Sequence, residues 1–361
     1  MEKPVTGTRK AFLTGNETVA WAALAAGVDI MFGYPITPQN EIMHYWTRLA
    51  PKYNRGFLQT EDEISAGFTV CGAVIAGKKS FTATAGPGNT LMQEPFSMAE
   101  AMRLPTLAVI QQRGGPSSGT VIYSQQEVTL TTYGGNGEGH RIVYSTAGHQ
   151  ELYDYTIKGF NTAWKYRFPT FILGDGYQAK MREPLELYDP EEKGIEMVPT
   201  KPLVGLEGNI GVNREPQHLC NIYSLEEELY DVVLEVQAEY ERISKEIVEY
   251  DQGYCDDAEI LILSHGVVSR SASDAVDILR SQGIKAGWFR PITLRPFPTE
   301  QFRAVLQSGI KKLLIVESAW GQLYRLIGPE IYGETVPIET LYKPGVGVID
   351  IDIIDKVKSL I

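Results

Sequence analysis

The sequence predicts an α/β protein in which a doubly wound, parallel-sheet domain is followed by a smaller α/β domain. Three observations support this prediction. Segments with helical periodicity alternate with short apolar, strand-like segments over residues 1–175, and a second alternation runs over residues 253–361. Between them, residues 176–252 combine a proline-rich extended linker with one long helix. Strands that alternate with helices form βαβ units, and these units build parallel sheets.

The elements of the first domain follow from this periodicity. Strands are expected at residues 28–33, 56–59, 80–84, 106–112, 141–145 and 169–173, and helices at 17–26, 40–49, 64–76, 89–103 and 150–166. The glycine at 27 favours a left-handed helix end. The helix at 64–76 is apolar on nearly every face, which is typical of a buried helix. Residues 114–140 form a long polar stretch that is rich in glycine.

The rest of the chain is organised differently. Five prolines interrupt residues 175–223, which predicts an extended excursion rather than a domain. A helix is expected over 224–250, with Ser224 as its N-cap and Glu227 three residues later. Its acidic face is interpreted as a solvated surface. The small second domain is expected to be parallel, with strands at 259–264, 285–289 and 312–317 and helices at 269–282 and 300–307.

Composition excludes several classes of protein. Acidic residues outnumber basic ones by 45 to 33, so the formal charge of −12 disfavours binding to nucleic-acid backbones. No apolar run approaches the ~20 residues that a membrane helix needs, and the polar first ten residues lack the core of a secretory signal. Three separated cysteines build neither a disulfide framework nor a metal or iron–sulfur cage. A cytoplasmic protein is therefore expected.

A rigid loop after the first strand is a candidate ligand site. Residues 34–39 (YPITPQ) contain two prolines that fix the backbone on either side of Thr37. In an open parallel sheet, ligands bind just beyond the carboxyl ends of the strands. The loop can therefore present the Thr37 hydroxyl to a ligand. The alternative is a stiff connector between strand and helix.

Glu63 has two interpretations. Residues 60–63 (TEDE) match a capping box, in which the carboxylate serves only the helix N-terminus. Alternatively, the carboxylate lies desolvated at the mouth of a buried helix and faces a nitrogen of a ligand. The sequence does not show where this side chain points, so both interpretations remain open.

Arg113 is expected to end a strand at the same edge of the sheet. Its guanidinium can hold a carboxylate through two parallel hydrogen bonds. A surface arginine beside a flexible loop is the alternative. The turn at residues 86–88 (GPG) lets a backbone approach a ligand closely, although it lacks the Lys-Ser/Thr of a phosphate-binding loop. The five histidines show no zinc-like spacing, and no Gly-x-Ser-x-Gly elbow is present.

Taken together and in order, the motifs resemble those of a known family. The chain is similar to the α subunit of the thiamine-dependent 2-oxoacid:ferredoxin oxidoreductases, which act on pyruvate, 2-oxoglutarate, branched-chain 2-oxoacids or oxalate. The resemblance covers nearly the whole chain. It is carried by residues 15–17 (GNE), 33–38 (GYPITP), 61–64 (EDEI), 82–88 (TATAGPG), 91–94 (LMQE), 112–116 (QRGGP), 290–298 (RPITLRPFP) and 316–317 (VE).

The resemblance implies a role for each candidate residue. Glu63 matches the family's catalytic glutamate, which hydrogen-bonds the pyrimidine N1′ and favours the imino tautomer of thiamine. Thr37 and Arg113 correspond to the residues that hold the 2-oxoacid carboxylate. Residues implied in binding thiamine diphosphate are Tyr34, Pro35, Ile36, Glu63, Gly86 and Pro87.

The same resemblance implies partners. The α subunit supplies the pyrimidine-binding domain and a transketolase C-terminal-like domain. A β subunit supplies the diphosphate and Mg²⁺ site and a [4Fe-4S] cluster, so no metal is expected on this chain. Residues 174–176 (GDG) resemble the start of the magnesium signature, but the required later asparagine is missing and Asn209 comes too late. A γ subunit, a ferredoxin-like δ subunit and an (αβ)₂ assembly are expected, with CoA and ferredoxin as reactants.

The substrate is left open by the sequence. Residues 38–42 (PQNEI) and 134–137 (GGNG) resemble branched-chain 2-oxoacid enzymes, whereas residues 61–64 and 82–84 resemble 2-oxoglutarate enzymes. Asn136 replaces a histidine that is common in both. Two other functions are also carried forward: a non-catalytic scaffold subunit with the same fold, and a flavin- or nicotinamide-binding enzyme that uses the glycine-rich turns.

Overall fold

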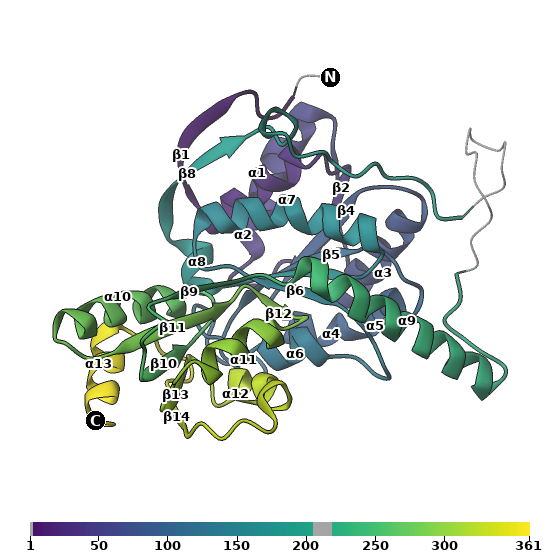
Figure 1. The fold of residues 1–361 in the computed structure, drawn as a ribbon. Helices are drawn as coiled ribbons and strands as arrows, with labels where there is room; N and C mark the ends of the chain where they lie inside the picture. The colour runs from purple at the N-terminus through teal and green to yellow at the C-terminus, as the bar shows by residue number, and fades with distance from the viewer. Residues whose placement is uncertain (1–2, 205–218) are drawn as a thin grey trace.

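A seven-stranded sheet forms the centre of the first domain in the computed structural model, which describes residues 3–204 and 219–361 (Figure 1). Its strand order is β12-β6-β7-β5-β4-β2-β3, and all neighbours are parallel except β12 and β6. The bounds are β2 Ile30–Gly33, β3 Gly56–Gln59, β4 Ser80–Thr84, β5 Leu107–Gln112, β6 Ile142–Ser145, β7 Thr170–Asp175 and β12 Thr293–Arg295.

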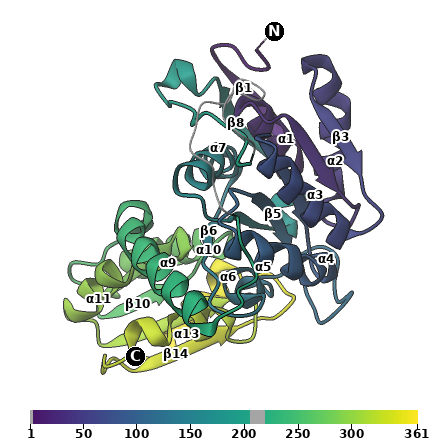
Figure 2. The same cartoon turned by 90° about the vertical axis from the view of Figure 1, so that its right-hand side faces the viewer.

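Helices cover both faces of this sheet because its strands are apolar on both sides. Within β5, Leu107 and Val109 join one apolar core, whereas Ala108 and Ile110 join another. The first core is completed by α1 (Gly15–Ala25), α2 (Asn40–Leu49) and α7 (His149–Tyr166). The opposite side carries α3 (Glu63–Ile75), α4 (Pro87–Leu91), α5 (Gln93–Ala101) and α6 (Val128–Tyr133) (Figure 2).

Two expectations for these helices are wrong. Helix α3 is not buried on every face, since Phe68 and Gly72 are exposed while Val70 and Val74 face the core. The sheet covers only one side of the helix, and its apolar outer face is left open. The predicted helix at 89–103 is two helices, α4 and α5, with Met92 between them.

The region after β7 is more ordered than its prolines suggested. Helix α8 (Gly176–Lys180) is followed by β8 (Arg182–Tyr188), which pairs antiparallel with β1 (Thr8–Thr14) as a separate ribbon. A short 3-10 turn covers Glu191–Lys193. Asn209 and the last proline of the predicted excursion lie outside the described residues. Helix α9 (Glu226–Ile247) has Leu225 rather than Ser224 at its N-cap, without a side-chain capping bond.

The second α/β unit contains a five-stranded sheet of order β14-β13-β10-β11-β9. Its elements are β9 Tyr250–Gly253, β10 Ile260–Leu263, α10 Val268–Ser281, β11 Ala286–Pro291, α11 Thr299–Gln307, β13 Lys312–Glu317, α12 Gln322–Ile327, β14 Ile338–Tyr342 and α13 Asp350–Lys358. The three predicted strands, β10, β11 and β13, are parallel as expected. Two strands were not predicted: β14 joins β13 parallel, and β9 joins the other edge antiparallel to β11.

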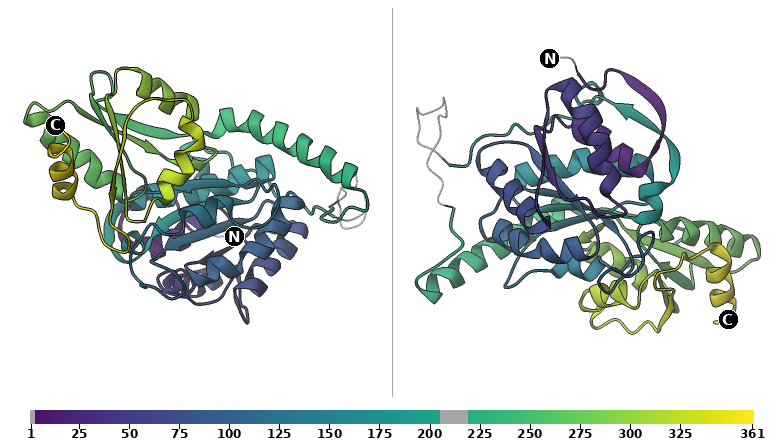
Figure 3. Two further views of the ribbon diagram at one scale, coloured as in Figure 1. Left: turned by 90° about the horizontal axis from the view of Figure 1, so that it is seen from below. Right: turned by 180° about the vertical axis from the view of Figure 1, so that it is seen from behind.

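The two units share structure rather than merely touching. Strand β12 belongs to the second half of the chain, yet it pairs with β6 and extends the first sheet. A single core contains Phe96 and Phe171 of the first unit together with Phe289 and Leu261 of the second. Helix α9 runs from beside the first unit toward the second and extends beyond the body (Figure 3). None of the helices in the described part of the chain combines the length and apolar character that a bilayer crossing requires.

Candidate functional site

The predicted site residues meet at the carboxyl edge of the central sheet. Strands β5, β4 and β2 are neighbours, and each is followed directly by a predicted segment. Arg113 follows β5, the Gly86-Pro87-Gly88 turn follows β4, and the loop with Thr37 follows β2. Glu63 begins α3, which follows the adjacent strand β3. The topology therefore brings together side chains that lie 76 residues apart.

Glu63 does not belong to the capping box that the sequence suggested. The N-cap is Asp62, whose carboxylate accepts a hydrogen bond from the Ser65 amide at 2.7 Å. The Thr60 hydroxyl instead donates to the Asp62 carbonyl at 2.8 Å. Because Asp62 already serves the helix N-terminus, the Glu63 side chain is free to point elsewhere.

The Glu63 carboxylate is buried without a partner from another residue. Its side chain belongs to a residue that is only 5% exposed. Within the described part of the chain, its carboxylate forms no hydrogen bond or ion pair with a different residue. Burial raises the pKa of Glu63, and the charge of Arg113 acts in the opposite direction. Such a carboxylate is suited to accept a hydrogen bond from a nitrogen of a bound ligand.

The Gly86-Pro87-Gly88 turn separates Glu63 from Arg113. Gly86 has φ +52°, a conformation that strongly favours glycine, and a Cβ there would lie 2.5 Å from Arg113 Nε. A Cβ on Gly88 would lie 2.6 Å from Glu63 Oε1. Both glycines are therefore required by close packing, one against each candidate side chain.

Arg113 is not a surface arginine. It is 6% exposed, and its guanidinium donates a hydrogen bond to the Thr37 carbonyl at 2.7 Å. Its Nε is buried without a hydrogen-bond partner in the described part of the chain. A buried donor that lacks a partner is costly, and a ligand oxygen would satisfy it. The contact with Thr37 links two of the residues that the sequence singled out.

The loop that carries Thr37 is held by its own polar groups. The Gln39 amide donates to the Tyr34 carbonyl at 3.0 Å, and the Asn40 amide donates to the Ile36 carbonyl at 2.9 Å. Tyr34, Ile36 and Thr37 are half-buried, whereas Pro35 is exposed. The loop is therefore a rigid rim of the site.

Sequence reasoning missed one buried carboxylate, Glu127. It is 4% exposed and accepts hydrogen bonds from the main-chain amides of Gly86 and Arg113. It lies in the stretch that the sequence indicated only as polar and rich in glycine. No spacing or motif marks this residue. The one visible signal is its place as a single acid directly before the short helix α6.

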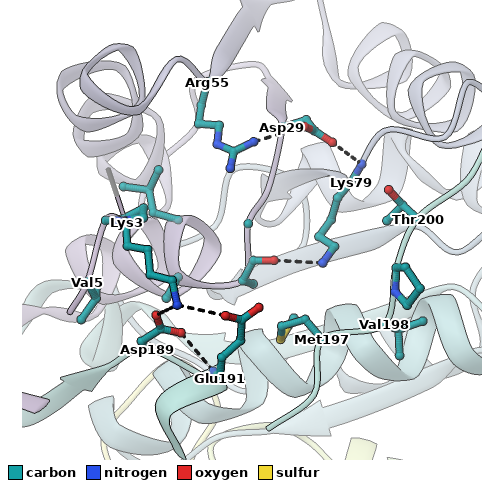
Figure 4. A pocket seen from close by; sticks show the side chains of 16 residues that line it. Lys3, Val5, Asp29, Arg55, Lys79, Asp189, Glu191, Met197, Val198 and Thr200 are labelled. Carbon is teal, nitrogen blue, oxygen red and sulfur yellow. Dashed lines mark hydrogen bonds and ion pairs between the residues drawn. The ribbon is translucent and has the colours of Figure 1, made fainter. Parts of the chain in front are cut away.

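Other candidates lie away from the site or have structural partners. Asp175, in the motif resembling a magnesium signature, caps α8 by accepting from the amides of Tyr177 and Gln178. No group of three or more metal-ligating side chains is found among residues 3–204 and 219–361. A cavity of about 410 Å³ lies near the opposite edge of the sheet, where Lys3 pairs with Asp189 and Glu191 (Figure 4).

The sequence matches two family profiles over most of its length. Residues 21–252 match the family described as pyruvate flavodoxin/ferredoxin oxidoreductase, thiamine diphosphate-binding, and residues 258–354 match pyruvate:ferredoxin oxidoreductase core domain II. The thiamine-binding profile contains all of the candidate residues described above.

Relatives match the chain almost end to end. The ketoisovalerate oxidoreductase subunit VorB of Methanothermobacter thermautotrophicus is 34% identical over 96% of both chains. The 2-oxoglutarate synthase subunit KorA of Methanothermobacter marburgensis is 33% identical over 88% of this chain and 90% of its own.

Solved structures share the fold. One is a 2-oxoglutarate:ferredoxin oxidoreductase from Magnetococcus marinus, solved with 2-oxoglutarate, coenzyme A and succinyl-CoA bound. It superimposes on this chain with a TM-score of 0.86 at 26% sequence identity, and the match covers 97% of this chain and 65% of that chain. A split-gene transketolase has a TM-score of 0.58 at 13% identity, which shows a shared fold. The thiamine-binding profile, the subunit relatives and the fold establish that this chain belongs to the pyruvate flavodoxin/ferredoxin oxidoreductase family, as an α-type subunit of a 2-oxoacid:ferredoxin oxidoreductase.

Proposed function

We propose that this chain supplies the pyrimidine half of a thiamine diphosphate site that oxidatively decarboxylates a 2-oxoacid to an acyl-CoA and carbon dioxide. One observation carries the proposal: a buried, unpartnered carboxylate, Glu63, faces the turn that also packs against Arg113. Both residues lie at the carboxyl edge of a domain whose family binds thiamine diphosphate. The arrangement provides an acceptor for the cofactor and a cation for the substrate.

Glu63 is proposed to bind the pyrimidine. Its carboxyl group is proposed to hydrogen-bond the N1′ atom, and because burial raises its pKa it can share a proton with N1′; when N1′ carries that proton, N1′ donates and the carboxylate accepts. When bound, thiamine diphosphate supplies the carbon nucleophile that attacks the 2-oxoacid. Tyr34, Pro35, Ile36, Gly86 and Pro87 are proposed as the rim that encloses the pyrimidine on this side.

Arg113 and Thr37 are proposed to hold the substrate carboxylate. The Arg113 guanidinium offers its buried Nε and the donors not used by the Thr37 carbonyl. The Thr37 hydroxyl adds a neutral donor from the rigid loop. Charge-assisted bonds of this kind orient the oxoacid so that its oxo carbon faces the cofactor.

Partner subunits are implied by the relatives, which are named as subunits of oxidoreductases. We propose that a β subunit supplies the diphosphate and Mg²⁺ site together with an iron–sulfur cluster. A [4Fe-4S] cluster takes four cysteine ligands, and this chain has three cysteines. A γ subunit and a ferredoxin-like δ subunit are proposed to complete the path to ferredoxin.

The relatives act on two classes of 2-oxoacid, branched-chain 2-oxoacids and 2-oxoglutarate. Subunits of ketoisovalerate and of 2-oxoglutarate enzymes match this chain with nearly equal identity. We therefore propose a branched-chain 2-oxoacid or 2-oxoglutarate. Comparing the turnover of both substrates by the assembled enzyme decides between them.

Glu63→Gln in the assembled enzyme tests the proposal. The variant should fold, because Asp62 rather than Glu63 caps the helix. It should lose most turnover, since a neutral amide cannot carry the charge that polarises the pyrimidine. Near-normal turnover with bound thiamine diphosphate would refute the assignment of Glu63. The outer-face variant Gly72→Ala, made in the same helix with open space around it, is the matched control for folding.

A further inference from the structure

We propose that Glu127 is a positioning residue that fixes Arg113 and the Gly86-Pro87-Gly88 turn in the arrangement needed to bind the 2-oxoacid. The inference rests on the proposed function, because it concerns the residue assigned there to the substrate carboxylate. Glu127 itself lies behind these groups and is not placed against substrate or cofactor.

The contacts of Glu127 span the ends of two neighbouring strands. Its Oε1 accepts hydrogen bonds from the Gly86 amide at 2.8 Å and from the Asn89 side-chain amide at 3.1 Å. Its Oε2 accepts from the Arg113 amide at 2.9 Å. One carboxylate therefore ties the segment after β4 to the segment after β5. Both segments carry groups that form the proposed site.

A carboxylate suits this position better than an amide. Three N–H donors converge on two oxygens, and an ionised carboxylate is an acceptor at both. A glutamine of the same shape would turn its own N–H₂ toward one of these donors. Either the Gly86 amide or the Arg113 amide would then lose its acceptor in a buried environment. The backbone on one side of the site would have to move.

The segment that carries Glu127 is anchored from the second α/β unit. The amide of Gln125 donates to the Ser318 carbonyl, and the Ser318 amide donates back to Gln125 Oε1, both at 3.0 Å. Gln125 also donates to the His265 carbonyl at 2.8 Å. The second unit contains no proposed binding residue, yet it holds the segment that positions Arg113.

The test uses the complete complex, purified with its partner subunits. Wild type, Glu127→Gln and Glu127→Asp are compared for kcat and KM with the preferred 2-oxoacid. Binding of oxamate, an analogue that keeps the oxo-carboxylate group, is measured by calorimetry as a readout that does not depend on turnover. We expect Glu127→Gln to raise KM and the oxamate Kd at least tenfold, and we expect the shifted Gly86-Pro87-Gly88 turn to lower kcat at the same time. Glu127→Asp keeps a carboxyl group at this position and should have an intermediate effect.

A matched control separates positioning from general destabilisation. Asp189 is also a buried carboxylate, accepting from the Glu191 amide at 3.0 Å and pairing with Lys3, but it lines the cavity near the opposite edge of the sheet. Asp189→Asn should lower the melting temperature and leave KM unchanged.

The outcomes distinguish the two proposals. The role of Glu127 would be overturned if the wild-type complex is active and both Glu127 variants keep its KM and oxamate affinity. It would also be overturned if these values change no more than they do in Asp189→Asn. A wild-type complex that does not oxidise any 2-oxoacid would instead overturn the proposed function. If Glu127→Gln does not assemble, the Glu127→Asp values decide the question alone.

Discussion

Gly88→Ala tests how closely the site is packed around Glu63. Gly88 lies in the first turn of α4, between Thr84 at the end of β4 and the Glu63 carboxylate. A Cβ at this position would lie 2.2 Å from Thr84 Oγ1 and 2.6 Å from Glu63 Oε1. Real Cβ atoms essentially never come within 3.0 Å of such atoms. The added methyl group must therefore displace one or both side chains.

The distances set the size of the effect. Thr84 Oγ1 must move by about 0.8 Å and the Glu63 carboxylate by about 0.4 Å to reach a separation of 3.0 Å. Overpacking of this kind costs roughly 1–3 kcal/mol in stability, and alanine returns up to ~1 kcal/mol through its better helix propensity. A misplacement of about 1 Å in a catalytic group costs up to ~100-fold in rate. We expect kcat to fall about tenfold to 100-fold, with a net loss of stability between about 0 and 3 kcal/mol.

The assay follows reduction of a low-potential dye by the assembled enzyme with 2-oxoacid and CoA, together with urea unfolding. Gly347→Ala is the control, because a Cβ there meets no atom within 4 Å. It should keep wild-type kcat and stability. If Gly88→Ala folds and its kcat stays within twofold of wild type, the Glu63 carboxylate does not need the position described here.

Arg113 and His140 provide two further tests. Arg113→Ala should raise KM for the 2-oxoacid about tenfold to 100-fold, because charge-assisted hydrogen bonds contribute roughly 1.5–3 kcal/mol. Arg113→Lys should not restore the wild-type KM fully, since lysine lacks the two parallel donors. An unchanged KM in both variants would remove Arg113 from the site. Burial lowers the pKa of His140 from 6.5 to about 4. Between these pH values the unfolded chain therefore binds more protons than the folded chain. The contribution of His140 to the free energy of unfolding should fall by about 2 kcal/mol between pH 7 and pH 5. His140→Phe replaces the imidazole with an aromatic ring that can stack on Tyr240 but does not titrate, so urea unfolding at the two pH values should show a smaller loss of stability than in wild type; an equal loss would contradict this assignment.

Periodicity predicted the six strands that residues 1–175 contribute to the central sheet, because each is a short run between turn residues, but it missed β1 at Thr8–Thr14. The structure has strands at Gly56–Gln59 and Ser80–Thr84 with the predicted bounds, and helix Asn40–Leu49 likewise. Elements that depend on distant pairing were not predictable in the same way. Strand β8 contains a proline, and its residues pair with residues of β1 that lie 168 to 180 positions away in the sequence; β12 is only three residues long.

The candidate site was predictable where residue type and strand end coincide. Thr37, Arg113 and the Gly86 turn follow strands, so the topology alone places them at one edge. Glu63 remained ambiguous because a capping glutamate and a ligand-facing glutamate have the same local sequence. The contact between Asp62 and Ser65 decided against capping, and only coordinates supply that contact. Glu127 was missed since two of its three hydrogen-bond donors are main-chain amides, which leave no trace in the sequence, and the third is the side chain of Asn89, 38 residues away.

We propose that this chain holds one half of a thiamine diphosphate site and needs a partner subunit for the other half. The most direct measurement is the stoichiometry and affinity of thiamine diphosphate binding, by calorimetry with Mg²⁺, for the chain alone and for the chain assembled with its β subunit. We predict that the chain alone does not bind thiamine diphosphate tightly and that each αβ pair binds one molecule tightly. In Glu63→Gln the binding by the αβ pair should be weakened or lost. A monomer of this chain that binds thiamine diphosphate tightly and turns over a 2-oxoacid by itself would contradict the shared site and the role of Glu63 in it.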